Sequence, residues 1–213
     1  MDRTYALNHN NKKAAENMTK LSQEGLELLF YDARTHYAWQ DEPVSDAVLT
    51  EIYDAAKMGP TSANCSPLRI VFVKSPEAKK KLKPCLAPGN VDKTMSAPVT
   101  AIFAYDLEFY QHMPYLFPFT DAKSWWEGKP EFILESAKRN ADLQAAYFIL
   151  AARSFGLDCG PMSGFDNQAV DEAFLKGTTY KSDFLCNLGF GDAENLPGPR
   201  APRFDFEKVC KVV

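Results

Sequence analysis

The chain of 213 residues lacks any apolar run that could cross a membrane. An apolar run such as Phe148–Ala152 is short, whereas a membrane-spanning helix needs about 18 apolar residues or more. The first 22 residues are polar and contain no apolar segment of the kind found in secretory signals. We therefore expect a cytoplasmic protein.

Paired cysteines and clustered metal ligands are also missing. The five cysteines are scattered with no C-x-x-C pair, and the only histidines are His9, His36 and His112. Scattered cysteines without a secretory signal predict reduced thiols. A zinc site would need ligands at clustered spacings, so we expect no protein-bound metal.

The two common nucleotide-binding motifs do not occur either. Gly189-Phe190-Gly191 lacks the third glycine and the following helix of a dinucleotide fingerprint, and there is no P-loop sequence. Lys and Arg number 24 against 28 Asp and Glu, a net charge of -4. This charge gives no overall attraction to nucleic acid or anionic lipid, so any anion site must be local.

What is present fits one globular domain. With 46% hydrophobic residues, the chain is long enough to bury a full core and too short to require two domains. Residues 1–20 are rich in Asn, Lys and charge, which predicts an N-terminal arm, and residues 21–213 form the domain.

The hydrophobic pattern alternates between helical and strand-like segments. It predicts N-caps at Ser45, Ser75 and Asp166, and a helix end at Gly156. The predicted helices span residues 21–32, 45–58, 75–83, 131–155 and 166–174, and the predicted strands span 68–74, 98–104 and 183–189. This order predicts a three-layer α+β or α/β domain around a central sheet, with strand order left open.

Two connections combine residues that could bind a flat polar ligand. The loop from Gly59 to Pro67 places hydroxyl and amide groups between prolines, and the turn Gly160–Gly164 lets backbone N–H groups approach a ring closely. Ordinary turns use the same residue types. Taken singly, neither segment decides between the two interpretations.

Several cations occur in irregular segments. Arg34, Arg200 and Arg203 offer the forked donors that a phosphate prefers, and Asn90 and Lys93 are three residues apart and could face one ligand. The alternative for each is a solvated surface side chain.

These segments occur in one order that resembles the nitroreductase family of flavoproteins over residues 21–213. The segments that resemble its malonic semialdehyde reductase branch are Ala33–His36, Gly59–Asn64, Phe117–Ala122, Cys159–Asn167 and Phe184–Gly189. The resemblance implies an α+β, three-layer fold with a mostly antiparallel sheet. It also implies an interlocked homodimer that binds FMN at the dimer interface.

The resemblance also implies roles for particular residues. Those expected at the cofactor are Arg34, Thr35, His36, Thr61, Ser62, Asn64, Asn90, Lys93, Met162, Ser163, Gly164, Arg200 and Arg203. The arginines and Thr35 are expected at the phosphate and ribityl chain, and Asn90 and Lys93 at the pyrimidine edge. Met162–Gly164 is expected near N5, where the backbone of Ser163 tunes the ring and no side chain is assigned as catalytic. Two positions depart from many relatives: Tyr37 replaces a cation and Ser163 replaces Glu.

The implied activity is a ping-pong reaction in which NADH or NADPH reduces FMN and a small substrate then reoxidises it. The branch implies malonic semialdehyde as substrate, reduced to 3-hydroxypropionate in pyrimidine degradation, with Arg69, Lys93 or His36 binding its carboxylate. The alternatives are a broad nitroaromatic or quinone reductase, a flavin-binding protein without turnover, and a hydrolase that uses Cys65 or Cys159. The aromatic residues between 105 and 126 are expected to cover the site or a dimer groove, or to line the core.

Overall fold

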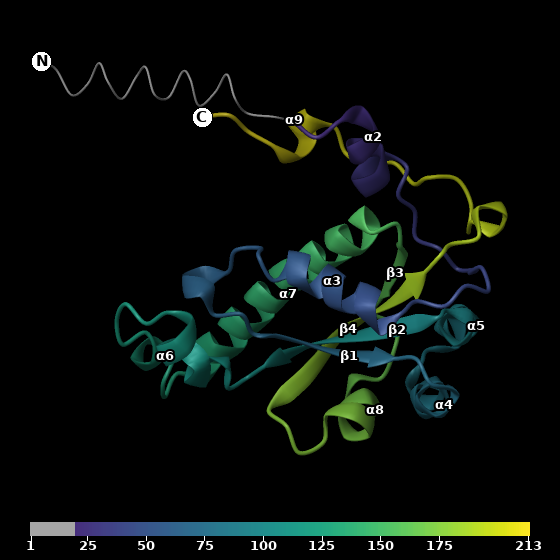
Figure 1. The fold of residues 1–213 in the computed structure, drawn as a ribbon. Coiled ribbons are helices and arrows are strands. Elements are labelled where there is room, and N and C mark those ends of the chain that lie inside the picture. Colours follow the sequence, from purple (N-terminus) through teal and green to yellow (C-terminus); the bar gives the residue numbers. More distant parts are fainter. Residues whose placement is uncertain (1–19) are drawn as a thin grey trace, which may run out of the picture.

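In the computed structural model, which describes residues 20–213, one antiparallel sheet forms the centre and helices cover both of its faces (Figure 1). Its four strands lie in the order β1-β2-β4-β3. They are β1 (Leu68–Val73), β2 (Val99–Asp106), β3 (Asp158–Met162) and β4 (Tyr180–Gly189). All three neighbouring pairs are antiparallel. The structure confirms the three-layer α+β fold with a central antiparallel sheet.

Alternating side chains of β2 divide the core between the two faces. Phe103 packs in a cluster with residues of α3 (Asp46–Ala56) and α7 (Pro130–Ser154), whereas its neighbour Ile102 packs against α4 (Pro76–Leu82) and α8 (Asn167–Val170). Because successive side chains of a strand point to opposite faces, β2 must be apolar throughout to bury both.

The other elements lie at the edges of these layers. They are α2 (Gln23–Leu26), which continues as a wider helical turn over Glu27–Tyr31, α5 (Val91–Ser96), α6 (Met113–Leu116) and α9 (Phe206–Val209). Residues 197–213 are exposed along their whole length and run along the outside of the molecule (Figure 1). Within residues 20–213, no helix combines the length and apolarity needed to cross a bilayer.

The predicted helix ends are confirmed. Ser45 Oγ accepts a hydrogen bond from Val48 N at 3.2 Å, and Ser75 and Asp166 cap α4 and α8 in the same way. Gly156 follows α7 with a φ of +80°, a conformation that glycine adopts without the steric cost of a Cβ atom.

Four elements, β3, α5, α6 and α9, were not predicted. Residues 160–162 were expected in a turn, but they belong to strand β3, and only Ser163 and Gly164 lie in the turn. Pro161 is accepted there because β3 lies at the edge of the sheet, where an N–H group is not needed on the outer side. Helix α5 was missed, and β4 begins at Tyr180, three residues before the predicted start. The predicted N-terminal arm lies outside the described residues, except for Lys20.

Candidate functional site

A cavity of about 600 Å³ lies between the segment after α2 and the C-terminal segment. Arg34, Thr35, Arg200 and Arg203, all predicted site residues, line it. Arg34 donates a hydrogen bond to the carbonyl of Gly198 at 2.5 Å, and Arg200 donates to the carbonyls of residues 31 and 33 at 2.5 and 2.9 Å. These bonds hold the two segments together and leave further N–H groups of the guanidinium groups available to a ligand.

The cavity also contains Arg153, which was not predicted. Arg153 stands in the last turn of α7, where a cation is expected for the helix dipole alone, so nothing in the sequence marked it as part of a site. Within residues 20–213, none of the four arginines in the cavity forms an ion pair. Four neighbouring cations without a carboxylate favour an anion with several oxygens, such as a phosphate.

Strand β3 leads from this cavity to a second group of predicted residues. Thr35 forms a parallel bridge with Cys159, and Gly164 lies five residues further on, a distance of about 16 Å along an extended chain. Asn90 Nδ2 donates to Gly164 O at 2.7 Å. A Cβ atom on Gly164 would lie 2.5 Å from Asn90 Nδ2, so only glycine allows this contact.

The turn after β3 presents unused donors. The amides of Ser163 and Gly164 donate to no other residue in the described part of the chain. Lys93, one turn of helix after Asn90, places its Nζ atom 4.0 Å from the centre of the Tyr37 ring. The structure therefore brings Asn90 and the Ser163-Gly164 turn together, with Lys93 on the helix that follows Asn90.

His36 lies differently from its neighbours Arg34 and Thr35. Its side chain is 7% exposed, and Nε2 is 3.4 Å from Asp158 Oδ1. A Cβ atom on Gly191 would lie 2.2 Å from His36 Nδ1, so the ring packs against the backbone of residue 191. A contact between His36 and the cofactor stays a prediction.

The loop with Thr61, Ser62 and Asn64 has an unusual backbone. Ala63, Asn64 and Ser66 have φ angles of 49°, 55° and 40°, a region that costs most non-glycine residues on the order of 1 kcal/mol or more. Hydrogen bonds hold it: Ser62 N donates to Asn140 Oδ1 at 2.8 Å, and Ser66 N to Thr61 Oγ1 at 3.3 Å. The loop is therefore rigidly shaped before any ligand binds.

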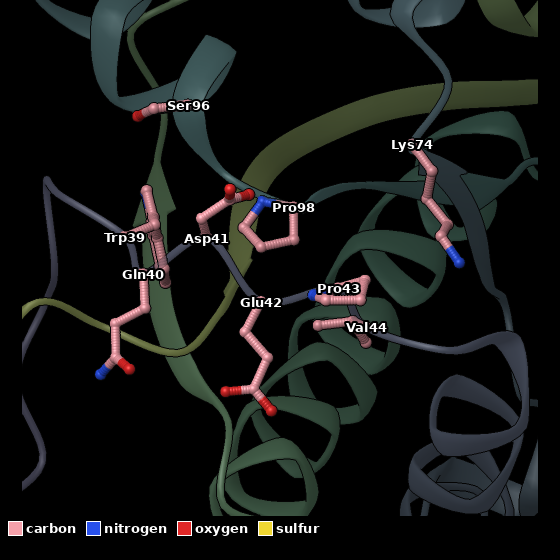
Figure 2. A pocket seen from close by; sticks show the side chains of 9 residues that line it. All are labelled: Trp39, Gln40, Asp41, Glu42, Pro43, Val44, Lys74, Ser96 and Pro98. Carbon is pink, nitrogen blue, oxygen red and sulfur yellow. The ribbon is translucent and has the colours of Figure 1, made fainter.

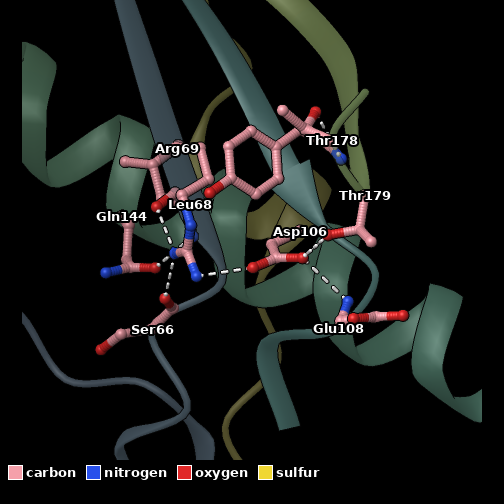
Figure 3. Close-up of polar contacts among 9 residues, drawn as sticks. Ser66, Leu68, Arg69, Asp106, Glu108, Gln144, Thr178 and Thr179 are labelled. Carbon is pink, nitrogen blue, oxygen red and sulfur yellow. Dashed lines mark hydrogen bonds and ion pairs between the residues drawn. The ribbon is translucent and has the colours of Figure 1, made fainter. Parts of the chain in front are cut away.

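Further bonds fix the point where this loop enters β1 (Figure 3). Leu68 N donates to Gln144 Oε1 at 3.0 Å, and Arg69 donates to the carbonyl of Ser66 at 3.1 Å. Arg69 also pairs with Asp106 at 2.6 Å. Because Arg69 is occupied in this way, it is a poor candidate for binding a substrate carboxylate.

The predicted residues thus fall into two groups. We call Arg34, Thr35, Asn90, Lys93, Met162, Ser163, Gly164, Arg200 and Arg203 the cationic half, and Thr61, Ser62 and Asn64 the loop half. Ser62 contacts Asn140 of α7, whereas Arg153 of the same helix lines the cavity of the cationic half. Thirteen helical residues separate these two contacts, a distance of about 20 Å along the axis.

The aromatic segment lines the core in part. Phe109 and Trp126 are buried in a core cluster near the start of α7. Tyr115 and Phe119 are 86% and 83% exposed beside the loop half, since Asn64 Nδ2 donates to the carbonyl of Leu116. Their cover over a site stays a prediction.

A second hollow, of about 570 Å³, contains none of the predicted site residues (Figure 2). Trp39 and Pro98 form part of its wall together with acidic side chains of Asp41 and Glu42. Trp39 connects it to the cationic half, because its indole N–H donates to Lys93 O at 3.0 Å.

The two cysteines considered as nucleophiles are fully buried. Burial raises the pKa of Cys65 to about 11, so its thiol stays protonated at neutral pH. Cys159 lies inside β3 with no exposed surface. All five cysteines are unbridged in the structure, as predicted.

Comparison with known proteins gives one consistent result. Residues 31–191 match the model of the nitroreductase family. A Burkholderia lata protein named as a candidate NADH dehydrogenase/NAD(P)H nitroreductase is 57% identical over 195 residues, which is 92% of this chain and all of that protein. A relative of the same description from Stutzerimonas stutzeri is 53% identical over 89% of this chain and 96% of its own length.

Solved structures share the fold. The nitroreductase-like YdfN of Bacillus subtilis superposes with a TM-score of 0.82 at 21% identity, covering 90% of this chain and all of that one. A nitroreductase-like protein of Exiguobacterium sibiricum, solved in complex with FMN, gives a TM-score of 0.78 at 19% identity, over 92% of this chain and all of its own.

Proposed function

The chain belongs to the nitroreductase family, and from that premise we propose that it is an FMN-dependent oxidoreductase that takes electrons from NADH or NADPH. The observation that carries the proposal is the cavity lined by Arg34, Arg153, Arg200 and Arg203. No carboxylate within residues 20–213 neutralises these four cations, and the flavin phosphate is the anion that fits them.

The rest of the cationic half fits the remainder of FMN. Thr35 lies at the cavity to meet the ribityl chain, and β3 leads on to Asn90, Lys93 and the Ser163-Gly164 turn. Asn90 and Lys93 would bind the pyrimidine edge of FMN, and the unused amides of the Ser163-Gly164 turn would be available as donors to its N5 atom. Bound FMN supplies the hydride chemistry, by accepting a hydride from the nicotinamide and passing it to the substrate. The protein binds and orients the ring and fixes the donors around it.

We propose a homodimer. About 20 Å along α7 separates the loop half from the arginine cavity of its own chain. A second copy would supply its Thr61–Asn64 loop to the ring. Support comes from large exposed apolar side chains in the helical turn Glu27–Tyr31, on and directly after α7, and in the C-terminal segment. A monomer would leave these side chains in water. They are Leu28, Phe30, Phe132, Leu143, Phe155, Phe204, Phe206 and Val209.

The substrate that the sequence motifs favour is malonic semialdehyde, reduced to 3-hydroxypropionate. Its carboxylate needs a cation beside the flavin, and three were considered. Arg69 is paired with Asp106, and His36 is buried against Asp158. Lys93 forms no ion pair in the described part of the chain and is the cation that we favour. A broad nitroaromatic or quinone reductase is the second candidate, because the curated relatives carry the name NAD(P)H nitroreductase.

The two remaining alternatives are less well supported. A hydrolase would need an accessible thiolate, and Cys65 and Cys159 are fully buried. A flavin-binding protein without turnover differs from the enzyme in one measurable property: its flavin colour would survive anaerobic addition of NADH or NADPH.

Anaerobic stopped-flow mixing tests the proposal. NADH and NADPH in turn should bleach the purified yellow protein, and each candidate substrate is then mixed with the reduced form. Fastest reoxidation by malonic semialdehyde supports the aldehyde reductase, and fastest reoxidation by a nitroaromatic or quinone supports the second candidate. A colourless protein that binds no added FMN would overturn the proposal.

A further inference from the structure

Lys79 is a lysine buried in the layer beneath the cationic half. Only 5% of its surface is exposed, and no carboxylate of residues 20–213 pairs with it. Burial lowers the pKa of its ammonium group to about 8. A buried cation without a counter-ion costs stability, so its presence calls for an explanation beyond packing.

The hydrogen bonds of Lys79 lead to α5. Its Nζ atom donates to the carbonyl of Thr94 at 2.8 Å and to Thr100 Oγ1 at 2.7 Å. Thr100 Oγ1 in turn donates to Asn187 Oδ1 at 2.7 Å. Asn187 Nδ2 donates to the carbonyl of Lys93 at 3.1 Å, which completes a path from Lys79 to the residue expected at the flavin.

A branch of the same network reaches β3. Thr94 Oγ1 donates to Met162 Sδ at 3.4 Å. The carbonyl of Lys93 also accepts a hydrogen bond from the indole of Trp39 at 3.0 Å. The backbone of α5 around Lys93 is therefore held from three sides, by α4, by β4 and by the segment after His36.

We propose that Lys79 is a positioning residue, which holds α5 and thereby fixes the Lys93 ammonium group at the pyrimidine edge of the flavin. This inference rests on the proposed function. Helix α5 has only six residues and therefore little stability of its own. Lys79 donates two hydrogen bonds, to the carbonyl of Thr94 and to Thr100 Oγ1, at a buried place that water does not reach. Lys93 then stabilises the negative charge of the reduced ring.

The first test compares Lys79→Met with Lys80→Met. Methionine keeps the length of the side chain and removes its charge and donors, and Lys80 is the exposed neighbour on the same helix. Lys79→Met should shift the midpoint potential of bound FMN to more negative values and weaken FMN binding about tenfold, the middle of the range for groups coupled in one hydrogen-bond network. Lys80→Met should change neither. Equal values for the two variants would overturn the inference.

A double-variant cycle shows whether Lys79 acts through Lys93. Lys93→Met alone should shift the potential in the same direction. If Lys79 works by placing Lys93, then Lys79→Met should add little to the shift in a Lys93→Met background. Fully additive shifts would overturn the positioning role, because they would mean that Lys79 acts on the flavin independently.

A second pair of variants covers the case in which Lys79→Met does not fold. Thr100→Val removes, at nearly constant volume, the hydroxyl that links Lys79 to Asn187, and Thr100→Ser keeps this hydroxyl. The potential should shift in Thr100→Val and stay unchanged in Thr100→Ser, and the same potential in both would contradict the path. Failure of the proposed function shows separately, since the unmodified chain would then bind no FMN.

Discussion

The cavity of Arg34 and Arg200 and the loop of Thr61 to Asn64 lie about 20 Å apart along α7, and different forces shape them. Together with Arg153 of α7, the cationic half contains positive charges from four separate segments. An anionic ligand would relieve the repulsion between these charges. The loop half contains no charged side chain and is shaped by strained backbone that buried amides of α7 hold in place. The comparison indicates that the cationic half provides most of the affinity for FMN, whereas the loop half provides a fixed surface against which FMN is placed.

The largest expected effect is on turnover, and it tests whether the cationic half of one chain and the loop half of another form one site. Arg34→Ala should disable the cationic half, and Ser62→Trp should block the loop half without removing a described hydrogen bond, because Ser62 is exposed. Each variant alone should have almost no NAD(P)H-dependent turnover when FMN is kept well below the raised dissociation constant of Arg34→Ala.

Mixing the two variants tests whether each site uses both chains. After unfolding and joint refolding, half of the dimers are mixed, and one of their two sites combines an unchanged cationic half with an unchanged loop half. Turnover should therefore recover to about a quarter of the unmodified level by this count of sites. No recovery in a mixture shown to contain mixed dimers would mean that each site is built within one chain.

A smaller effect separates affinity from stability in the cationic half. Arg34→Ala removes a charge-assisted contact to the phosphate, worth about 1.5 to 3 kcal/mol, so the dissociation constant of FMN should rise roughly ten- to hundredfold. The melting temperature of the FMN-free protein should hardly change. Arg139→Ala, on an exposed arginine paired with Glu135, is the matched control for fluorescence titration of FMN.

The loop half should respond in the opposite way. Asn140→Ala leaves the amide of Ser62 without its buried acceptor, which should lower the free energy of unfolding by about 1 to 3 kcal/mol. Urea unfolding of the FMN-free protein measures this loss, again with Arg139→Ala as the control on the same helix. An unchanged midpoint would show that the loop keeps its left-handed residues without help from α7.

Local signals made most of the fold predictable. Ser45, Ser75 and Asp166 cap their helices with bonds to residues three positions away, so the sequence contains the whole interaction. Strand β3 was not predicted because Gly160 and Pro161 are typical of a turn. A strand tolerates these two residues here because β3 lies at the edge of the sheet.

The sequence suggested residues for the site and not their arrangement, and the role of these residues at a cofactor stays a prediction. The order of motifs suggested both halves, but their separation depends on where α7 directs each end. The burial of Lys79 could not be predicted, because Lys79 is one of several lysines on a helix whose sequence is typical of an exposed helix. Its burial depends on contacts with α5 and β2. The place of Arg153 in the cavity could not be predicted either, because a cation in the last turn of a helix is common without any ligand.

The smallest expected effect is a difference in pH dependence between the halves. Beneath the cationic half, burial lowers the pKa of Lys79 from 10.5 to about 8. Between these values the unfolded chain binds a proton that the native chain does not, so the free energy of unfolding rises with pH. Beside the loop half, burial raises the pKa of Cys65 from 9.0 to about 11. There the native chain keeps a proton that the unfolded chain loses, and stability falls as pH rises.

Two variants should separate these opposing slopes. In urea unfolding between about pH 7 and pH 11, Lys79→Met should lose the rise and Cys65→Ala should lose the fall, each by less than about 1.4 kcal/mol per pH unit. The unmodified chain should show little net slope from these two groups where their windows overlap. If Lys79→Met kept the slope of the unmodified chain, the ammonium group would not be buried as the structure places it, and the hydrogen-bond path from Lys79 to Lys93 would lose its starting point.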